Sequence, residues 1–226
     1  MVPPSVAAFD QIMRSLETLT MEHALLGRGL GALEIVARME RDGMPVPDET
    51  VKRLLGFFET FGDRYHHIKE EHVLIPRLED GCGSRARCHA GKVIGEVFYE
   101  HEVGRKLLSK LQLAAANLER GGGAKRAFSL MADDYIAFLR NHVAKEKDHL
   151  IRSASWKLSA EDGALQKSFS DYVRREEIGE TAREFAAEID DILAELSILV
   201  PVPTRRAYSR GSIPYHRGRN AGPITF

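Results

Sequence analysis

Short interruptions divide the first two-thirds of this chain into four long segments of helix-forming residues. Asp42-Gly43 and the prolines of MPVP end the first segment, Gly81-Cys82-Gly83 ends the second, and three consecutive glycines at 121–123 end the third. These signals predict helices over residues 5–41, 48–79, 84–120 and 124–152. Short connections make neighbouring helices antiparallel, so we expect an all-α fold built on an up-down-up-down four-helix bundle.

The last third of the chain has a different pattern. Ser159 to Asp162 resembles a capping box, so we expect one helix to about residue 177 and another over 179–199, both packed on the bundle. Residues 201–226 hold five arginines, no acid and several prolines, which predicts an irregular basic tail. The expected divisions are a bundle at 1–155, a helical extension at 156–200 and the tail at 201–226. No internal repeat is evident.

The overall composition excludes several classes of protein. Lysine plus arginine total 32 and aspartate plus glutamate total 33, so the net charge of −1 gives no positive field for non-specific nucleic-acid binding. No apolar run approaches the length of a membrane span, and the N-terminus lacks the pattern of a signal peptide. Cys82 and Cys88 match no redox or zinc motif, so we expect free thiols and a cytoplasmic protein.

Four of the nine histidines occupy equivalent positions, one on each predicted helix. His23, His66, His101 and His142 share helical columns with apolar residues, so each is expected to point into the bundle. Each lies roughly 17 to 18 residues from the start of its segment, about 26 Å along the helix. Antiparallel helices of similar length then bring the four imidazoles to one level. Burying several imidazoles without partners is costly, and a metal ion removes that cost.

Two carboxylates complete this pattern. Glu70 follows His66 by one helical turn, and Glu146 follows His142 in the same way, so each pair lies on one face of its helix. Such a pair can bind one metal ion, or the carboxylate can bridge to a neighbouring ion. The six predicted metal ligands are His23, His66, Glu70, His101, His142 and Glu146.

The other histidines receive no ligand role. His67 and Glu71 form a second HxxxE pair that overlaps the first, but their helical column is mostly polar. We therefore interpret His67 as a surface residue or as one that supports the ligands from behind. Four others lie on polar stretches, in loops or near the end of the bundle: His72, His89, His149 and His216.

The segments MEHALL, YHHIKEEHVLIP, YEHEVGR and NHVAKEKDHL, in this order within residues 5–155, resemble the hemerythrin-like (HHE cation-binding) family. The resemblance implies a four-helix bundle around a non-haem di-iron centre, two iron ions with an oxo or hydroxo bridge. By position, His23 and His66 would serve one iron and His101 and His142 the other, with both glutamates bridging. Imidazole and carboxylate donors suit iron, whereas a four-coordinate zinc site would leave two of the six donors unused.

One position departs from the family pattern. Its oxygen-carrying members place a fifth histidine one turn after His101, where this chain has Arg105. A guanidinium is not a metal ligand, so we expect an open or water-filled position on one iron, with Tyr65 or Tyr135 as candidates to approach it. Arg105 is expected either to form a salt bridge, to Glu96 or Glu102, or to act in catalysis as the electrostatic partner of a bound anion, peroxide or superoxide.

An open position on a redox-active metal pair permits small oxidants to bind and react. The favoured hypothesis is an iron protein that reacts with hydrogen peroxide or a related small oxidant, in a catalase-like or peroxide-reducing manner. The alternative is a module that reversibly binds or senses O2, NO or iron without turnover, and a third is a scaffold with structural histidines. An apolar pocket is expected from Ile12, Leu16, Phe58, Phe98 and Phe138. The expected partners are small oxidants (O2, H2O2, NO), not nucleic acid or membranes, and the oligomeric state stays open.

Overall fold

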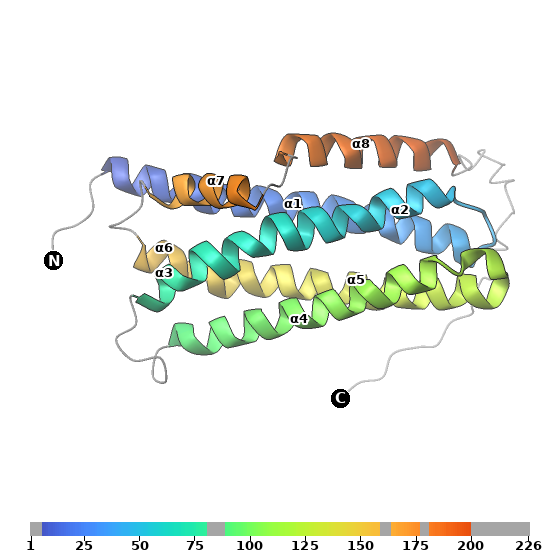
Figure 1. Cartoon of the computed structure of the whole chain (residues 1–226), viewed down its shortest axis with the longest axis horizontal. Helices are drawn as coiled ribbons and strands as arrows, with labels where there is room; N and C mark the ends of the chain where they lie inside the picture. Colours follow the sequence, from blue (N-terminus) through green and yellow to red (C-terminus); the bar gives the residue numbers. More distant parts are fainter. Residues whose placement is uncertain (1–5, 81–88, 159–163, 177–180, 200–226) are drawn as a thin grey trace, which may run out of the picture.

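The computed structural model describes residues 6–80, 89–158, 164–176 and 181–199, and every regular element in these ranges is helical (Figure 1). In chain order the elements are α1 (Val6–Arg41), α2 (Asp48–Phe57), the π-helical segments η1 (Phe58–His67) and η2 (Glu70–Leu74), α3 (Ile75–Asp80), α4 (His89–Ala115), the 3₁₀ segment η3 (Leu118–Arg120), α5 (Gly122–Lys145), the π-helical segment η4 (Glu146–Ile151), α6 (Arg152–Lys157), α7 (Leu165–Arg175) and α8 (Ala182–Leu199). The prediction of an all-α fold is confirmed.

Several of these elements follow one another without a break and form four long rods. The first rod is α1, the second runs from α2 through η1 and η2 to α3, the third is α4, and the fourth runs from α5 through η4 to α6. The first two rods end within about one residue of the predicted boundaries, whereas the fourth continues to Lys157. Cys82, Cys88, the predicted capping box and the basic tail lie outside the described residues.

Glycines form the turns at two rod ends. Gly43 has a φ of 76° after α1, and the amide of Met44 donates to the carbonyl of Met39 at 2.8 Å, which closes the helix end. Gly121 has a φ of 99° and directly precedes α5. Both glycines adopt a backbone conformation that other residues rarely take, so the interruptions seen in the sequence are turns in the structure.

The four rods lie side by side, and α5 packs along both α1 and α4 (Figure 1). Their apolar faces form two separate hydrophobic clusters along the length of the bundle. One cluster includes Leu26, Phe58 and Tyr135, and the other includes Leu16, Leu74 and Val97. Between these clusters lies a layer of buried polar side chains from all four rods. The bundle therefore encloses a polar layer with an apolar core on each side of it.

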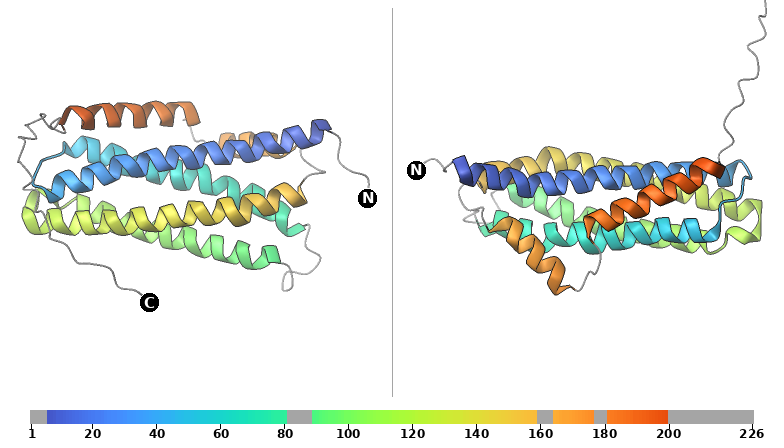
Figure 2. Two further views of the ribbon diagram at one scale, coloured as in Figure 1. Left: turned by 180° about the vertical axis from the view of Figure 1, so that it is seen from behind. Right: turned by 90° about the horizontal axis from the view of Figure 1, so that it is seen from above.

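The C-terminal helix α8 lies along α1 and α2 (Figure 2). Phe185, Ile189 and Ile192 join the hydrophobic cluster beneath it. At its edge, the Nε atom of Arg53 donates to Glu188 at 2.7 Å. The helix thus covers the side of the bundle formed by the first two rods. No helix within the described ranges combines the length and the apolar character that crossing a membrane requires.

Candidate metal centre

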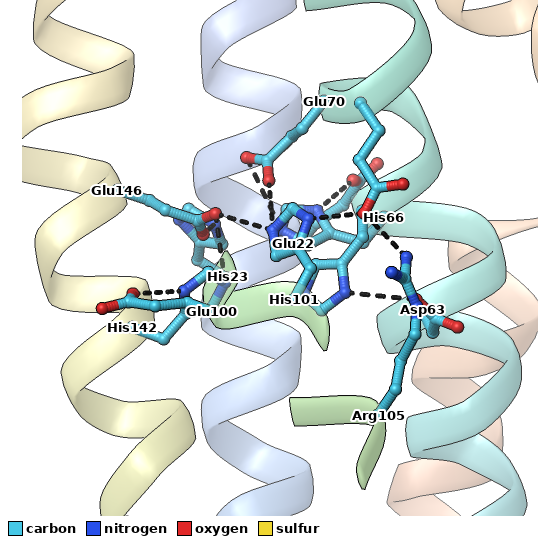
Figure 3. Close-up of polar contacts among 12 residues, drawn as sticks. Glu22, His23, Asp63, His66, Glu70, Glu100, His101, Arg105, His142 and Glu146 are labelled. Atoms are coloured by element: carbon cyan, nitrogen blue, oxygen red, sulfur yellow. Dashed lines mark hydrogen bonds and ion pairs between the residues drawn. The ribbon is translucent and has the colours of Figure 1, made fainter. Parts of the chain in front are cut away.

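The polar layer contains two adjoining groups of potential metal donors. The first group is His23, His66, Glu70 and Glu146, and the second is His67, His101 and His142. Within each group the donor atoms all lie within 4.8 Å of one another, and every one of these residues is buried. The structure therefore brings together all six predicted ligand residues, together with His67, and Figure 3 labels all of these side chains except His67. Their assignment as ligands remains a prediction.

The carboxylates of Glu70 and Glu146 lie between the histidines of the first group and the histidines of the second. Glu146 has its Oε2 atom 3.2 Å from Nε2 of His23, while its Oε1 atom lies 3.2 Å from Nε2 of His101 and 3.1 Å from Nε2 of His142 (Figure 3). Glu70 is placed in the same way, with Oε1 3.9 Å from Nε2 of His66 and Oε2 3.5 Å from Nε2 of His101. Each carboxylate thus directs one oxygen toward each group, as two bridging ligands would.

His67 belongs to this layer, so its interpretation as a surface residue is wrong, whereas a role in supporting the ligands stays a prediction. Its side chain is 7% exposed, and its ring stacks on that of His101 with 3.9 Å between the centroids. The error arises from the helix type. Segment η1 is π-helical, and its i→i+5 hydrogen bonds place more residues in each turn than the α-helical period assumes. Adjacent residues such as His66 and His67 then both reach the interior, so a column drawn with α-helical spacing misplaces His67.

An outer set of carboxylates holds the imidazoles. The Nδ1 atom of His66 donates to Glu22 at 2.9 Å, that of His142 to Glu100 at 2.9 Å, and that of His101 to Glu71 at 2.7 Å. An ionised carboxylate accepts hydrogen bonds but cannot donate them, so the proton of each ring is fixed on Nδ1. Once a ring is neutral, its Nε2 atom presents a lone pair to the centre, as a metal ligand must.

Two lysines extend this outer set. Lys69 donates to Glu22, and Lys145 donates to Glu100. The pattern is the same in both halves of the bundle, because a Glu-His pair on one rod (Glu22-His23 and residues 100–101) meets a His-x-x-Lys-Glu motif on the next (residues 66–70 and 142–146). The polar layer therefore repeats a unit that the sequence analysis did not detect.

The two halves differ at these lysines. The side chain of Lys69 is 3% exposed, and its ammonium lies 3.5 Å from the centre of the Tyr65 ring, whereas the Lys145 side chain is 56% exposed. The same contact network is thus enclosed in one half and reaches solvent in the other.

Arg105 uses all three of its guanidinium nitrogens on carboxylates. Its Nε atom donates to Asp63, Nη1 to Glu102 and Nη2 to Glu71, each at 2.7 Å (Figure 3). The expected salt bridge to Glu102 is therefore present, while two further partners come from the second rod. Burial opposes ionisation of Asp63 and Glu71, but the histidines and Arg105 beside them outweigh it and lower both pKa values.

Burial and charge give the donors very different pKa values. Burial and the neighbouring Glu146 raise the pKa of Glu70 to about 7, whereas the surrounding imidazoles outweigh burial at Glu146 and hold its pKa well below the usual range. Burial opposes charge on His101, but its carboxylate partners raise its pKa to about 11. Burial and the nearby His101 lower the pKa of His67 to about 3. Without a cation, protons and charge are thus unevenly shared across the layer.

Many of the inward atoms have no hydrogen-bond partner within the described chain. They are both ring nitrogens of His23 and of His67, Nε2 of His66 and of His142, both oxygens of Glu70, and Oε2 of Glu146. Leaving so many buried polar atoms unpaired is costly. A cation would accept their lone pairs, and the all-nitrogen and oxygen donor set suits iron. The residues present therefore fit a pair of metal ions.

The two tyrosines considered for an open position lie in different surroundings. Tyr135 is buried and lines a small cavity together with His67 and His142. Tyr65 instead lies against Lys69 and hydrogen-bonds to the backbone of Ala182. Of the two phenols, the structure brings Tyr135 to the histidines.

Several other expectations concern residues away from the layer. His72 is exposed and stacks on Tyr172 with 5.2 Å between the centroids. Phe58 and Phe138 lie beside the histidines as expected, but Phe98 is 39% exposed. The side chain of Ile12 lies outside those that the structure describes.

Comparison with known protein families also indicates a metal-binding domain. The model of the hemerythrin HHE cation-binding domain matches residues 14–154, which include most of each of the four rods and every donor named above. Comparisons with curated proteins and with solved structures gave no match. Since this one domain accounts for more than half of the chain, the protein belongs to the hemerythrin HHE cation-binding family.

Proposed function

We propose that this protein binds two iron ions in the polar layer and reacts there with hydrogen peroxide or a related small oxidant. The observation that supports the proposal is the placement of Glu70 and Glu146, each with one oxygen toward each histidine group. In this proposal the four rods form an up-down-up-down bundle at residues 1–155, with residues 156–200 as its extension and 201–226 as a basic tail.

The two metal positions receive different donor sets. His23 and His66 serve one ion, while His67, His101 and His142 serve the other, and both glutamates are shared. His67 thus replaces the histidine that Arg105 displaces from the third rod. When bound, an iron pair supplies a change of oxidation state and a position where a small oxidant can coordinate.

The chain itself positions and protects this pair. Glu22, Glu71 and Glu100 keep the three imidazoles oriented by accepting from Nδ1. The apolar clusters on either side keep bulk water from the layer, which strengthens the electrostatic contacts within it. Because three carboxylates already pair with Arg105, and one of them, Glu71, contacts His101, we assign Arg105 a positioning role through Glu71 in place of direct contact with an anion.

One observation favours the alternative, reversible binding or sensing of O2, NO or iron without turnover. The sequence argument against an oxygen carrier was the missing fifth histidine, and the structure places a fifth imidazole, His67, in the layer. A centre enclosed between two apolar clusters also suits retention of a neutral bound gas.

Metal content and turnover test the proposal. The purified chain, reconstituted anaerobically with ferrous iron, is expected to hold two irons and to evolve oxygen from hydrogen peroxide over many cycles. A reversible visible band on oxygen cycling without turnover would instead support the carrier or sensor. One iron or none per chain would contradict both functions.

A variant pair tests the shared carboxylates. Glu70→Ala is expected to abolish paired binding, while Glu49→Ala, an exposed position on the same rod, keeps two irons. Two magnetically coupled irons in Glu70→Ala would contradict the bridging role.

A further inference from the structure

A small cavity adjoins the second histidine group. It has a volume of about 20 Å³ and lies between the second, third and fourth rods, where it is lined by His67 and His142 on one side. Phe58, Tyr135 and Phe138 supply aromatic walls. A volume of this size admits a ligand of about one or two heavy atoms, so the cavity is a pocket for a very small ligand directly beside two of the potential metal donors.

The width of this cavity depends on a glycine. Gly104 lines it, and a Cβ atom added there would lie 3.2 Å from Cε1 of Phe138, closer than ordinary van der Waals contact. Any side chain at position 104 would therefore enter the space between α4 and the Phe138 ring. The absence of a side chain at this position keeps the pocket open.

Charged groups surround the side of the cavity that meets solvent. Among its lining residues, Asp63, Glu100 and Arg105 are partly exposed. Arg105 also bonds to Glu71 and Glu102, and Glu100 pairs with Lys145, so four carboxylates and two cations give a formal charge of −2. Because three carboxylates already accept hydrogen bonds from the guanidinium, the positive charge of Arg105 is offset by its partners.

We propose that this cavity is the entry and binding pocket of the metal centre, and that it selects neutral molecules of about two heavy atoms over anions. Gly104 and Phe138 set the size limit, and the carboxylates around Arg105 repel negative charge. The inference rests on the proposed function and refines it, because peroxide, O2 and NO satisfy both limits whereas azide, an anion of three heavy atoms, fails both. Arg105 and its carboxylate partners thereby discriminate against anionic ligands.

Ligand-binding rates on the iron-loaded protein test the size limit. Stopped-flow spectra would follow nitric oxide association in Gly104→Leu and in Gly95→Leu, a control on the same helix where an added Cβ meets no atom within 4 Å. We expect Gly104→Leu to slow association about tenfold and Gly95→Leu to leave the rate unchanged. Equal rates in two variants that both hold two irons would overturn the size limit.

A second variant covers the case in which Gly104→Leu loses its fold or its iron. Phe138→Ala enlarges the same gap, and we expect it to speed association of both nitric oxide and azide. An unchanged rate in Phe138→Ala would likewise overturn the pocket assignment.

The charge limit is tested with azide as the anionic probe. Glu102→Gln removes one carboxylate that contacts Arg105, and we expect it to speed azide association about two- to fivefold at low ionic strength, with nitric oxide unaffected. The effect should disappear near about 0.5 M salt, where charges are screened. Glu119→Gln, at the end of the bundle, serves as the control and should change neither rate.

The outcomes separate this inference from the proposed function. An azide rate that is unchanged in Glu102→Gln would overturn the charge limit while the iron centre stands. A wild-type chain that fails to load two irons would instead overturn the proposed function before any ligand is added.

Discussion

The Oε1 atom of Glu71 lies 2.7 Å from the Nδ1 atom of His101, so a carboxylate of the second rod orients an imidazole of the third. The same oxygen accepts a hydrogen bond from Nη2 of Arg105 at 2.7 Å. Glu71 is therefore held from two sides, and Arg105 fixes a histidine that it does not touch. If the layer holds metal ions as proposed, this contact lets a guanidinium orient a ligand from the position where oxygen-carrying members of the family have a histidine.

Removing the carboxylate should weaken metal binding without unfolding the chain. In Glu71→Ala, His101 loses the partner that fixes its proton on Nδ1, and we expect iron affinity to fall about 10- to 100-fold. Chelator competition on the ferrous protein measures this change. Glu102→Gln contacts Arg105 but no histidine, so its iron affinity should match the wild type. An equal loss in both variants would show that charge near Arg105 matters and that the bond to His101 does not.

His67 is expected to act as a ligand of the second metal position. Replacing it in His67→Leu preserves bulk in the buried layer but removes both nitrogens, so the chain should hold about one iron in place of two. His72→Leu is the matched control, since His72 follows on the same rod but is exposed and stacks on Tyr172. The iron content and the visible spectrum of the two variants test this ligand role. Two irons and an unaltered spectrum in His67→Leu would show that His67 is not a ligand and has a structural role.

The α-helical period predicted much of this layer because three of its seven donors lie in α-helices, and Glu70 and Glu146 each follow a predicted ligand by four residues. His23, His101 and His142 lie on α1, α4 and α5, where apolar columns mark the buried face. Turn signals correctly predicted the breaks at Gly43 and Gly121, where both glycines have positive φ angles, whereas the fourth rod runs beyond its predicted end to Lys157. That the four imidazoles lie at one level along the bundle was predicted from the lengths of the helices alone.

What the sequence could not show depends on contacts between rods and on local helix type. The π-helical segment that turns His67 inward has no marker in residue composition. Asp63 and Glu71 reach Arg105 from a different rod, so their pairing requires the packed bundle. The outer glutamates were detectable in principle. Glu22 and Glu100 each precede a predicted ligand by one residue, and a lysine directly precedes both Glu70 and Glu146, so this recurrence in the sequence could have indicated the outer set.

A close approach between the first two rods gives a prediction of stability. A Cβ added to Gly29 would lie 2.6 Å from Cε1 of Phe57 and 3.2 Å from the Cζ atom of Phe58, and both rings are buried. Overpacking of this kind costs about 1–3 kcal/mol, which exceeds the gain of about 0.5–1 kcal/mol from replacing a helical glycine with alanine. Gly29→Ala should therefore lower the free energy of unfolding.

Two neighbouring glycines are controls for this prediction. Added Cβ atoms at Gly27 and Gly31 meet no atom within 4 Å, so Gly27→Ala and Gly31→Ala should raise the free energy of unfolding by about 0.5–1 kcal/mol. Urea unfolding of the three variants without metal measures the difference. If Gly29→Ala stabilises the protein as much as its neighbours do, the helices are not in tight contact at this point.

Metal binding should release protons and strengthen as pH rises. In the metal-free chain, the pKa of His101 is raised to about 11, so its imidazole carries a proton that must leave before Nε2 can bind a cation. The pKa of Glu70 is about 7, so below that pH a second proton competes as well. Iron affinity is therefore expected to increase with pH across the neutral range and to fall more steeply below about pH 7. Calorimetric titration in buffers of different ionisation enthalpy counts the protons released, and a count of zero at pH 6.5 would contradict direct binding by these two residues.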